Sequence, residues 1–166
     1  MKFKILCSCA VFAFAVATTS AQMKSATSGT CAKPDVQTIP AGDHDGHVFM
    51  LGTGKCESKG EIGGAMSKEG AFAEHSDATA THTRAWGVYV ETFDSGDKIF
   101  YTYQSTGAVK GGMLTMGSNK YQITGGTGKM KGIKGSGTCK LTGTPDGGLT
   151  YDCTGEYTIA GAAAKM

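Results

Sequence analysis

The sequence predicts an all-β protein whose strands form an antiparallel meander that closes into a barrel or a sandwich. Short runs rich in Val, Ile, Tyr, Phe and Thr recur along the chain, and several of them alternate apolar with polar residues. Turn signals rich in Gly, Asp, Asn and Pro separate these runs at intervals of about 8 to 12 residues, as such meanders require. No segment shows an apolar stripe of useful length at helical spacing.

The last predicted strand shows the alternation most clearly. In LTYDCTGEYTI (residues 149–159), Leu, Tyr, Cys, Tyr and Ile fall on one face, and Thr, Asp and Glu fall on the other. The predicted strands are residues 48–51, 84–93, 99–104, 121–124, 139–144 and 149–159. The predicted turns are residues 94–97, 111–112, 117–119 and 145–148.

The first 21 residues have the three parts of a secretory signal peptide. Lys2 and Lys4 give a positive start, residues 5–17 an apolar core, and residues 19–21 a cleavage site of small residues. Because an apolar run of about a dozen residues is shorter than the ~20 that a spanning helix needs, cleavage is favoured over a membrane anchor. We therefore expect a secreted or periplasmic protein without a membrane span.

The remainder is predicted to be one domain, since about 145 residues are enough to bury a core. Residues 22–45 are polar and interrupted by prolines, so they are expected to form an extended segment. The β-barrel domain is predicted for residues 46–160, followed by a C-terminal tail at residues 161–166.

The charge pattern argues against a nucleic-acid partner. Without the two lysines of the signal, 14 basic residues equal the 14 acidic ones. Residues 22–97 hold 6 basic and 11 acidic residues, whereas residues 98–166 hold 8 basic and 3 acidic ones. The lysines of the second half lack the interleaved aromatic residues of single-strand binders, so a solvated basic face is favoured.

Four cysteines follow the signal, and local geometry favours one pairing. The Pro-Asp-Gly turn at residues 145–147 lies midway between Cys139 and Cys153, so a hairpin there places the two cysteines opposite each other. We expect a disulfide between them, which leaves Cys31 to bridge Cys56. Neither a C-x-x-C spacing nor a paired His motif indicates a zinc site instead.

The glycine- and lysine-rich stretch at residues 121–144 does not fit a nucleotide-binding loop. In a Walker loop, Gly128 would require Ser or Thr two residues later, where Met130 stands, and a glycine where Ile123 stands. The dinucleotide pattern fails because Lys131 occupies the position of its third glycine.

Within this stretch, ITGGTGKMKGIKGSG (residues 123–137) resembles the signature of the allene oxide cyclase and dirigent superfamily. The upstream strands, from about Gly46, agree with that family in kind and order. The resemblance implies a closed, eight-stranded, up-and-down antiparallel barrel with a central cavity. It also implies chemistry without a cofactor, and assembly as a homo-oligomer, a dimer or a trimer.

The resemblance further implies structural roles for the residues of the motif. Gly125, Gly126 and Gly128 are expected to form a tight corner with positive φ. Met130 is expected to plug the barrel end, and the glycines at residues 132–137 to open the next strand. Allene oxide cyclases close a fatty-acid epoxide and dirigent proteins steer radical coupling. The residues that perform this chemistry lie outside the motif and match no position here, so the motif predicts fold rather than activity.

Glu91 is the candidate for acid–base catalysis, since it lies in the alternating run RAWGVYVETF beside Tyr89 and Phe93. A carboxyl among aromatic rings has a raised pKa and can exchange protons near neutral pH. Because either face of this strand can line the cavity, a solvated Glu91 is the favoured interpretation. Candidate ligand-lining residues are Trp86, Tyr89, Tyr101 and Tyr103.

The sequence GDHDGH offers donor atoms of the type that Zn²⁺ or Cu²⁺ bind. A polar turn before the strand at residues 48–51 explains the same residues, so no metal is predicted. The residues concerned are Asp43, His44, Asp45 and His47.

Three functions remain open. The favoured hypothesis is that the cavity binds a small hydrophobic or aromatic molecule. The second is a cofactor-free cyclase or isomerase that works by confinement in the same cavity. The third is a structural or surface-interaction barrel with a filled interior.

Overall fold

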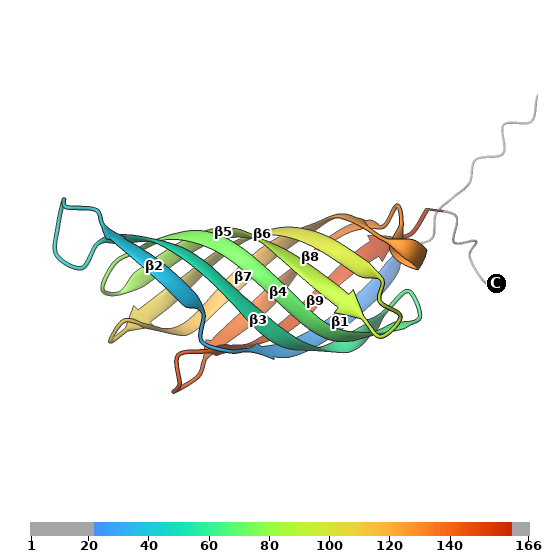
Figure 1. Ribbon diagram of the computed structural model, residues 1–166, viewed down its shortest axis with the longest axis horizontal. Helices are drawn as coiled ribbons and strands as arrows, with labels where there is room; N and C mark the ends of the chain where they lie inside the picture. The colour runs from blue at the N-terminus through green and yellow to red at the C-terminus, as the bar shows by residue number, and fades with distance from the viewer. Residues whose placement is uncertain (1–21, 161–166) are drawn as a thin grey trace, which may run out of the picture.

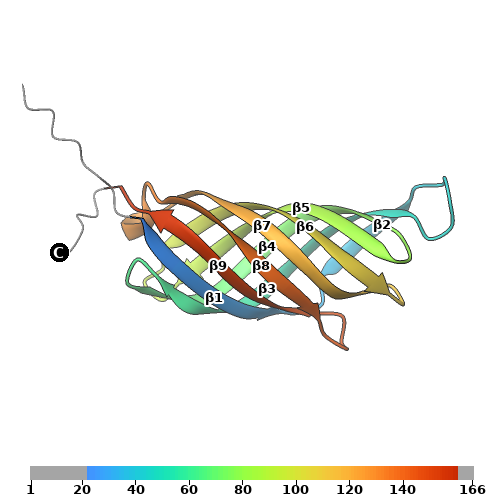
Figure 2. The ribbon, with the colours of Figure 1, turned by 180° about the vertical axis from the view of Figure 1, so that it is seen from behind.

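The computed structural model describes residues 22–160, so the predicted signal peptide and C-terminal tail lie outside the described residues. Within this range, nine antiparallel strands pair in the order β1-β9-β8-β7-β6-β5-β4-β3-β2, and β1 also pairs with β3. The additional pairing closes eight strands into an up-and-down barrel, and β2 continues along the edge of β3 (Figures 1 and 2). The prediction of a closed, eight-stranded antiparallel barrel is confirmed.

The strands follow one another with short connections. They are β1 (Met23–Cys31), β2 (Asp35–Pro40), β3 (Val48–Ile62), β4 (Ala65–Ala78), β5 (His82–Phe93), β6 (Lys98–Lys110), β7 (Met113–Gly126), β8 (Lys134–Gly143) and β9 (Leu149–Thr158). A short 3-10 helix, η1 (Gly128–Met130), lies between β7 and β8. No helix in the described part of the chain is long and apolar enough to cross a membrane.

Two segments of the barrel differ from the prediction. Residues 22–45 are not a lead-in, because β1 pairs with β9 on one side and with β3 on the other, and so closes the barrel. The barrel therefore begins at Met23 rather than at residue 46. β4 was not predicted at all. Both strands carry small or charged residues (MKSATSGTC and AMSKEGAFAEHSDA), and these hide the alternation of large apolar residues that marks a strand.

The predicted turn at residues 117–119 is also wrong, since these residues lie in the middle of β7. A Cβ atom on Gly117 would lie 2.6 Å from the carbonyl oxygen of Thr106 on β6. The glycine is therefore required by close approach of two strands rather than by a turn. The predicted turn at residues 111–112 joins β6 to β7, where both glycines have positive φ.

The expectation of positive φ at the glycine corner after β7 is wrong for Gly125 and Gly126. Of its three glycines, only Gly128 has a positive φ, at 52°. Gly126 is extended, and a Cβ atom there would lie 2.6 Å from the carbonyl oxygen of Met130. Gly125 pairs with Phe100 of β6 and has no crowded neighbour. Met130 is fully buried, at 0% exposure, and packs at this end of the barrel.

An apolar cluster fills the end of the barrel that η1 covers. Its members come from the loops and from the strand ends that meet there, and most of them are almost inaccessible to solvent. The cluster consists of Ile62, Ala65, Phe93, Ile99, Tyr101, Ile123, Met130, Ile133, Tyr157 and Ile159. One end of the barrel is therefore closed by packed side chains.

Two disulfides join neighbouring strands, as predicted. Cys31 on β1 is bonded to Cys56 on β3, and Cys139 on β8 is bonded to Cys153 on β9. Each pair is also a register pair of its ladder. The first disulfide therefore fastens the contact between β1 and β3 that closes the barrel.

Inward-facing aromatic rings lie across glycines of adjacent strands. A Cβ atom on Gly70 of β4 would lie 1.9 Å from the hydroxyl oxygen of Tyr89 on β5, so the ring passes over that glycine. Tyr103 passes over Gly87 in the same way. The other such pairs are Phe72 with Gly54, Tyr151 with Gly29, and Tyr121 with Gly137; the Tyr121 hydroxyl also reaches Gly155 on β9, two strands away. The rings thus lie along the barrel wall, in space that side chains on the adjacent strands would otherwise occupy.

The rings lean toward the β1–β3 contact from both directions around the barrel. Those of β4, β5 and β6 lean toward β3, and those of β7 and β9 lean toward β1. Tyr89 and Tyr151 meet at Ser58 of β3, where each hydroxyl lies 2.7 Å from Ser58 Oγ. Hydrogen bonds therefore join the two groups of rings across the closing contact of the barrel.

We expect Gly70→Ala to destabilise the protein by about 1–3 kcal/mol, because the new methyl group displaces the Tyr89 ring. Urea denaturation measures the loss. The control is Gly52→Ala on β3, where the new Cβ would have its nearest neighbour at 3.5 Å, an ordinary contact. Equal stability of the two variants would show that the Tyr89 ring does not depend on Gly70.

Candidate functional site

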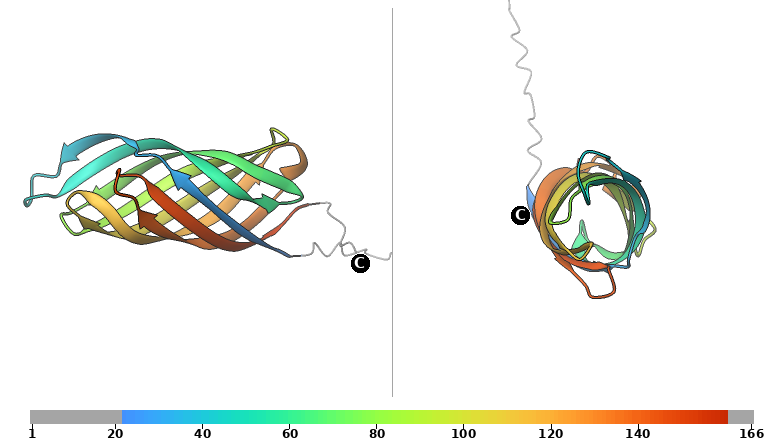
Figure 3. Two further views of the ribbon diagram at one scale, coloured as in Figure 1. Left: turned by 90° about the horizontal axis from the view of Figure 1, so that it is seen from below. Right: turned by 90° about the vertical axis from the view of Figure 1, so that its left-hand side faces the viewer.

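The open end of the barrel contains a cavity of about 900 Å³. The right-hand view of Figure 3 looks into this end, which lies opposite the end covered by η1. The loops at residues 111–112 and 145–148 contribute to the mouth, and Ile62 and Ile123 of the apolar cluster lie at the floor. The volume falls within the range of about 300 to 1,000 Å³ that is usual for small-molecule sites.

Tyrosines form a layer above the floor of the cavity. The structure places three of the predicted lining residues, Tyr89, Tyr101 and Tyr103, on the cavity wall, and adds Tyr121 and Tyr151. The ring centroids of Tyr89 and Tyr101 lie 5.8 Å apart, and those of Tyr101 and Tyr121 lie 5.5 Å apart. These tilted and edge-on contacts hold the rings in fixed orientations and leave parts of their surfaces open to the cavity.

Trp86 does not line the cavity, contrary to the prediction. Its ring lies on the outer face of the barrel, stacked on His75 with 5.3 Å between centroids, beside Leu51 and Val88 in an external hollow. Trp86 and Tyr89 are separated by an odd number of positions, and side chains alternate along a strand. The two residues therefore point to opposite sides of β5.

Glu91 is buried, at 3% exposure, and is not solvated as the sequence favoured. It lies on the cavity side of β5, and its Oε2 accepts a hydrogen bond of 2.7 Å from the Tyr101 hydroxyl. Burial raises the pKa of Glu91, and the bond from Tyr101 only partly opposes this. The arrangement is a carboxyl group that holds its proton to higher pH than an exposed glutamate does.

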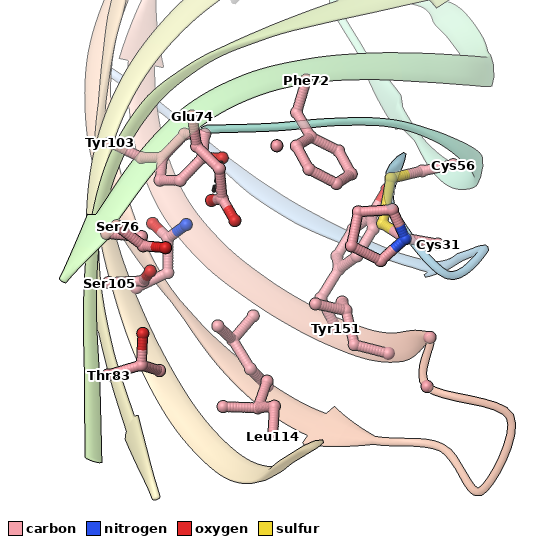
Figure 4. A pocket seen from close by; sticks show the side chains of 18 of the residues that line it. Cys31, Cys56, Phe72, Glu74, Ser76, Thr83, Tyr103, Ser105, Leu114 and Tyr151 are labelled. Carbon is pink, nitrogen blue, oxygen red and sulfur yellow. Dashed lines mark hydrogen bonds between the residues drawn. A yellow bond between two sulfur atoms is a disulfide. The ribbon is translucent and has the colours of Figure 1, made fainter. Parts of the chain in front are cut away.

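Glu74 is a second acid of the cavity, and the sequence analysis did not single it out. It lies on β4, and its Oε2 accepts a hydrogen bond of 2.7 Å from Tyr103 (Figure 4). Burial raises the pKa of Glu74, whereas the bond from Tyr103 and the charge of His75 lower it. The alternation of Phe72, Glu74 and Ser76 was the available signal. It was missed because β4 itself was missed.

Gly87 makes the contact between Glu74 and Tyr103 possible. In the ladders, Gly87 of β5 stands between Glu74 of β4 and Tyr103 of β6. A side chain at this position would collide with the Tyr103 ring, whose Cζ and hydroxyl oxygen would both lie 2.6 Å from the added Cβ. The absent side chain allows a tyrosine to reach a carboxyl group two strands away.

The upper wall of the cavity is lined by small polar and apolar side chains. Figure 4 shows Ser76, Thr83 and Ser105 on one side and Leu114 below them. The two disulfides also face this space. Above the tyrosine layer, the lining therefore combines apolar surface with scattered hydroxyl groups.

The histidine-rich loop before β3 lies at the mouth end of the barrel, apart from the tyrosine layer. His47 Nδ1 lies 2.6 Å from Asp43 Oδ1, and its Nε2 lies 2.9 Å from Asp77 Oδ1 on β4. These two carboxylates raise the pKa of His47, with the Asp43 bond the larger cause. The ligand atoms of Asp43, His44 and His47 all lie within 4.8 Å of one another. Asp45 is exposed in the same loop. The hydrogen bonds of His47 connect this loop to β4, which explains why these side chains lie together.

We expect Glu91 to make the protein less stable as the pH rises. The pKa of Glu91 is higher in the folded than in the unfolded chain, so its stabilising effect is full below the ordinary pKa of 4.5 and is lost as the pH rises through the folded pKa. Each unit of difference changes the free energy of unfolding by about 1.4 kcal/mol. Urea denaturation should show that the free energy of unfolding of the wild type declines between pH 5 and pH 8. The decline should be smaller in Glu91→Gln. Identical slopes would contradict this assignment.

No protein-family model matches the chain, and no curated protein matches it.

Proposed function

We propose that this protein is an exported barrel that binds a small apolar or aromatic molecule in its cavity. The observation that carries the proposal is the cavity of about 900 Å³ at the open end of the barrel. Tyrosine rings, aliphatic side chains and disulfide sulfurs present apolar surface, and a few hydroxyl and carboxyl groups offer directional contacts. This combination is typical of sites for small organic molecules.

The open space counts against the hypothesis of a structural barrel with a filled interior. An eight-stranded barrel has an interior that side chains can fill, or that can hold one small ligand. Here the large rings of Tyr89, Tyr103 and Phe72 lie along the wall over glycines instead of filling the centre. The space is thus a consequence of specific residues on several strands.

Export to an oxidising compartment agrees with the two disulfides, which are rare in reducing compartments. A secreted or periplasmic location is accordingly part of the proposal. Membership of the allene oxide cyclase and dirigent superfamily is supported by the motif at residues 123–137 and by the barrel topology. The homo-oligomer that this resemblance implies stays a prediction.

Binding can be tested with N-phenyl-1-naphthylamine, an apolar probe whose fluorescence rises in apolar surroundings, together with mass spectrometry of molecules that co-purify. We expect saturable binding of one probe per chain. Ser105→Trp should weaken it about tenfold or more, because Ser105 lines the cavity.

The control for this experiment is Gln104→Trp, which adds the same ring to the same strand at an exposed position. It should bind the probe as the wild type does. Equal binding by the two variants, or no saturable binding by the wild type, would overturn the proposal.

A second candidate function is a cofactor-free cyclase or isomerase, which Glu91 favours. Its buried carboxyl lies beside the cavity, and Tyr101 occupies one of its two oxygens. A protonated carboxyl in such a place can donate a proton to a substrate oxygen and take one back from carbon. An unsaturated fatty-acid epoxide is the substrate class that the resemblance suggests.

The enzyme hypothesis predicts that Glu91→Gln abolishes conversion of such an epoxide but leaves probe binding unchanged. Conversion is measured by chiral product analysis against the uncatalysed reaction. A racemic product formed at the uncatalysed rate by the wild type would remove this candidate and leave the binding function in place.

A further inference from the structure

The charged groups inside the cavity have one sign. Among the described residues that line it, Glu74 and Glu91 are the charged side chains of the interior, and Lys33 and Asp146 lie at the mouth. No Arg or His of residues 22–160 lines this space. Once these acids are ionised, the interior favours cations and repels anions.

Glu74 is the acid that a ligand can reach. Figure 4 shows its carboxyl group directed into the interior, between Tyr103 and Phe72. Oε2 accepts the bond from Tyr103, and no side chain of residues 22–160 donates a hydrogen bond to Oε1. This oxygen is not among the buried atoms that lack a partner, so it is open to the cavity and can accept a hydrogen bond from a ligand.

Asn119 on β7 lines the same space, but its Oδ1 is buried without a hydrogen-bond partner within the described range and is not open to the cavity. Glu74 is therefore the acceptor that a ligand can reach, and an ammonium group carries three N–H donors.

The aromatic rings suit a cation as well. Tyr103 and Phe72 flank Glu74, and Tyr89 and Tyr151 lie on the same cavity wall. A cation close to the face of such a ring is attracted to it, and the attraction is larger where water is excluded. Carboxylate and ring faces together are the groups that recognise organic cations.

We propose that the ligand is a small organic amine that binds as a cation, with its nitrogen paired to Glu74 and its apolar part on the tyrosine layer. This inference rests on the proposed binding function and narrows it to one chemical class. Because no Lys or Arg of residues 22–160 pairs with Glu74 and His75 lies on the outer face of β4, the ammonium group would be the cation that contacts Glu74 inside the cavity. The pairing moves no electrons and forms no covalent bond.

The proposal fixes the sign of the pH dependence. An amine pairs with ionised Glu74, whereas burial favours the neutral form of Glu74 in the empty cavity. Binding therefore releases a proton from those molecules in which Glu74 is protonated. The affinity for the amine should therefore rise with pH, up to the pH at which Glu74 is already ionised in the empty cavity. A neutral ligand that accepts a hydrogen bond from protonated Glu74 would show the opposite trend.

Other groups around Glu74 also affect its ionisation. Tyr103 of β6 donates to it, and the charge of His75 on the outer face of β4 favours its ionised form. Tyr89 and Glu91 face the cavity from β5, and β3 contributes Met50 and Gly52, which do not titrate. Measurements on Glu74→Gln separate the titration of Glu74 from that of these neighbours.

The test compares three probes of similar size: 2-phenylethylamine, 2-phenylethanol and phenylacetate. Each displaces N-phenyl-1-naphthylamine, whose aryl nitrogen stays uncharged between pH 5.5 and 7.5. We expect the amine to bind about tenfold or more tightly than the alcohol at pH 7.5, and phenylacetate to bind least. The affinity of the amine should rise from pH 5.5 to 7.5.

Two variants locate the contact. Glu74→Gln should weaken amine binding about 10- to 100-fold, since it removes a charged hydrogen bond, and should thereby abolish the preference for 2-phenylethylamine over 2-phenylethanol. Asp146→Asn, which removes an exposed acid at the mouth, should change amine affinity less than about twofold because exposed charges are screened.

The outcomes separate this inference from the function on which it rests. Probe binding combined with equal affinity for amine and alcohol, or with an unchanged amine affinity in Glu74→Gln, would overturn the amine assignment and keep the binding function. Loss of amine affinity in Glu91→Gln alone would overturn the choice of Glu74. Failure of the wild type to bind any probe would overturn both.

Discussion

The cavity depends on one steric constraint, namely that large rings inside the barrel lie across glycines of neighbouring strands. An eight-stranded barrel is only wide enough for side chains that meet at its axis or for one small molecule. Tyr89 over Gly70 and Tyr103 over Gly87 keep their rings against the wall, and so they add apolar surface without filling the centre. The same arrangement brings hydroxyl groups to partners on other strands, such as Ser58 and Glu74. The placement of rings over glycines thus determines both the shape and the polarity of the site.

The same placement of the tyrosine rings explains how acids are tolerated in an otherwise apolar interior. Glu91 and Glu74 each accept a hydrogen bond from a tyrosine hydroxyl, with 2.7 Å between the oxygens. Burial raises the pKa of both carboxyl groups. A neutral carboxyl with a hydrogen bond costs far less to bury than an unpaired carboxylate. The two acids nevertheless differ in their access to the cavity: Glu91 is almost completely enclosed, whereas Glu74 is directed into open space. Proton transfer suits the first position, and ligand pairing suits the second.

Sequence reasoning recovered the parts of the fold that large alternating residues and turns encode. Strands β5, β6 and β9 and the disulfide hairpin of Cys139 and Cys153 were predictable on that basis. β1 and β4 were not, because small and charged residues hide their alternation, and some of these, such as Gly29 and Gly70, make room for rings from other strands. Glu74 was lost together with β4. Trp86 was misplaced because the direction in which a strand faces is decided by the whole barrel, and a single alternating run fits either direction.

The barrel is closed at the η1 end by Met130 and its apolar neighbours, and this has a kinetic consequence. In the proposed binding function, a molecule reaches the tyrosine layer through the open end of the barrel. The loops at that end are then expected to affect the rates of entry and exit, whereas contacts with Glu74 and the tyrosine layer are expected to affect how tightly the molecule is held.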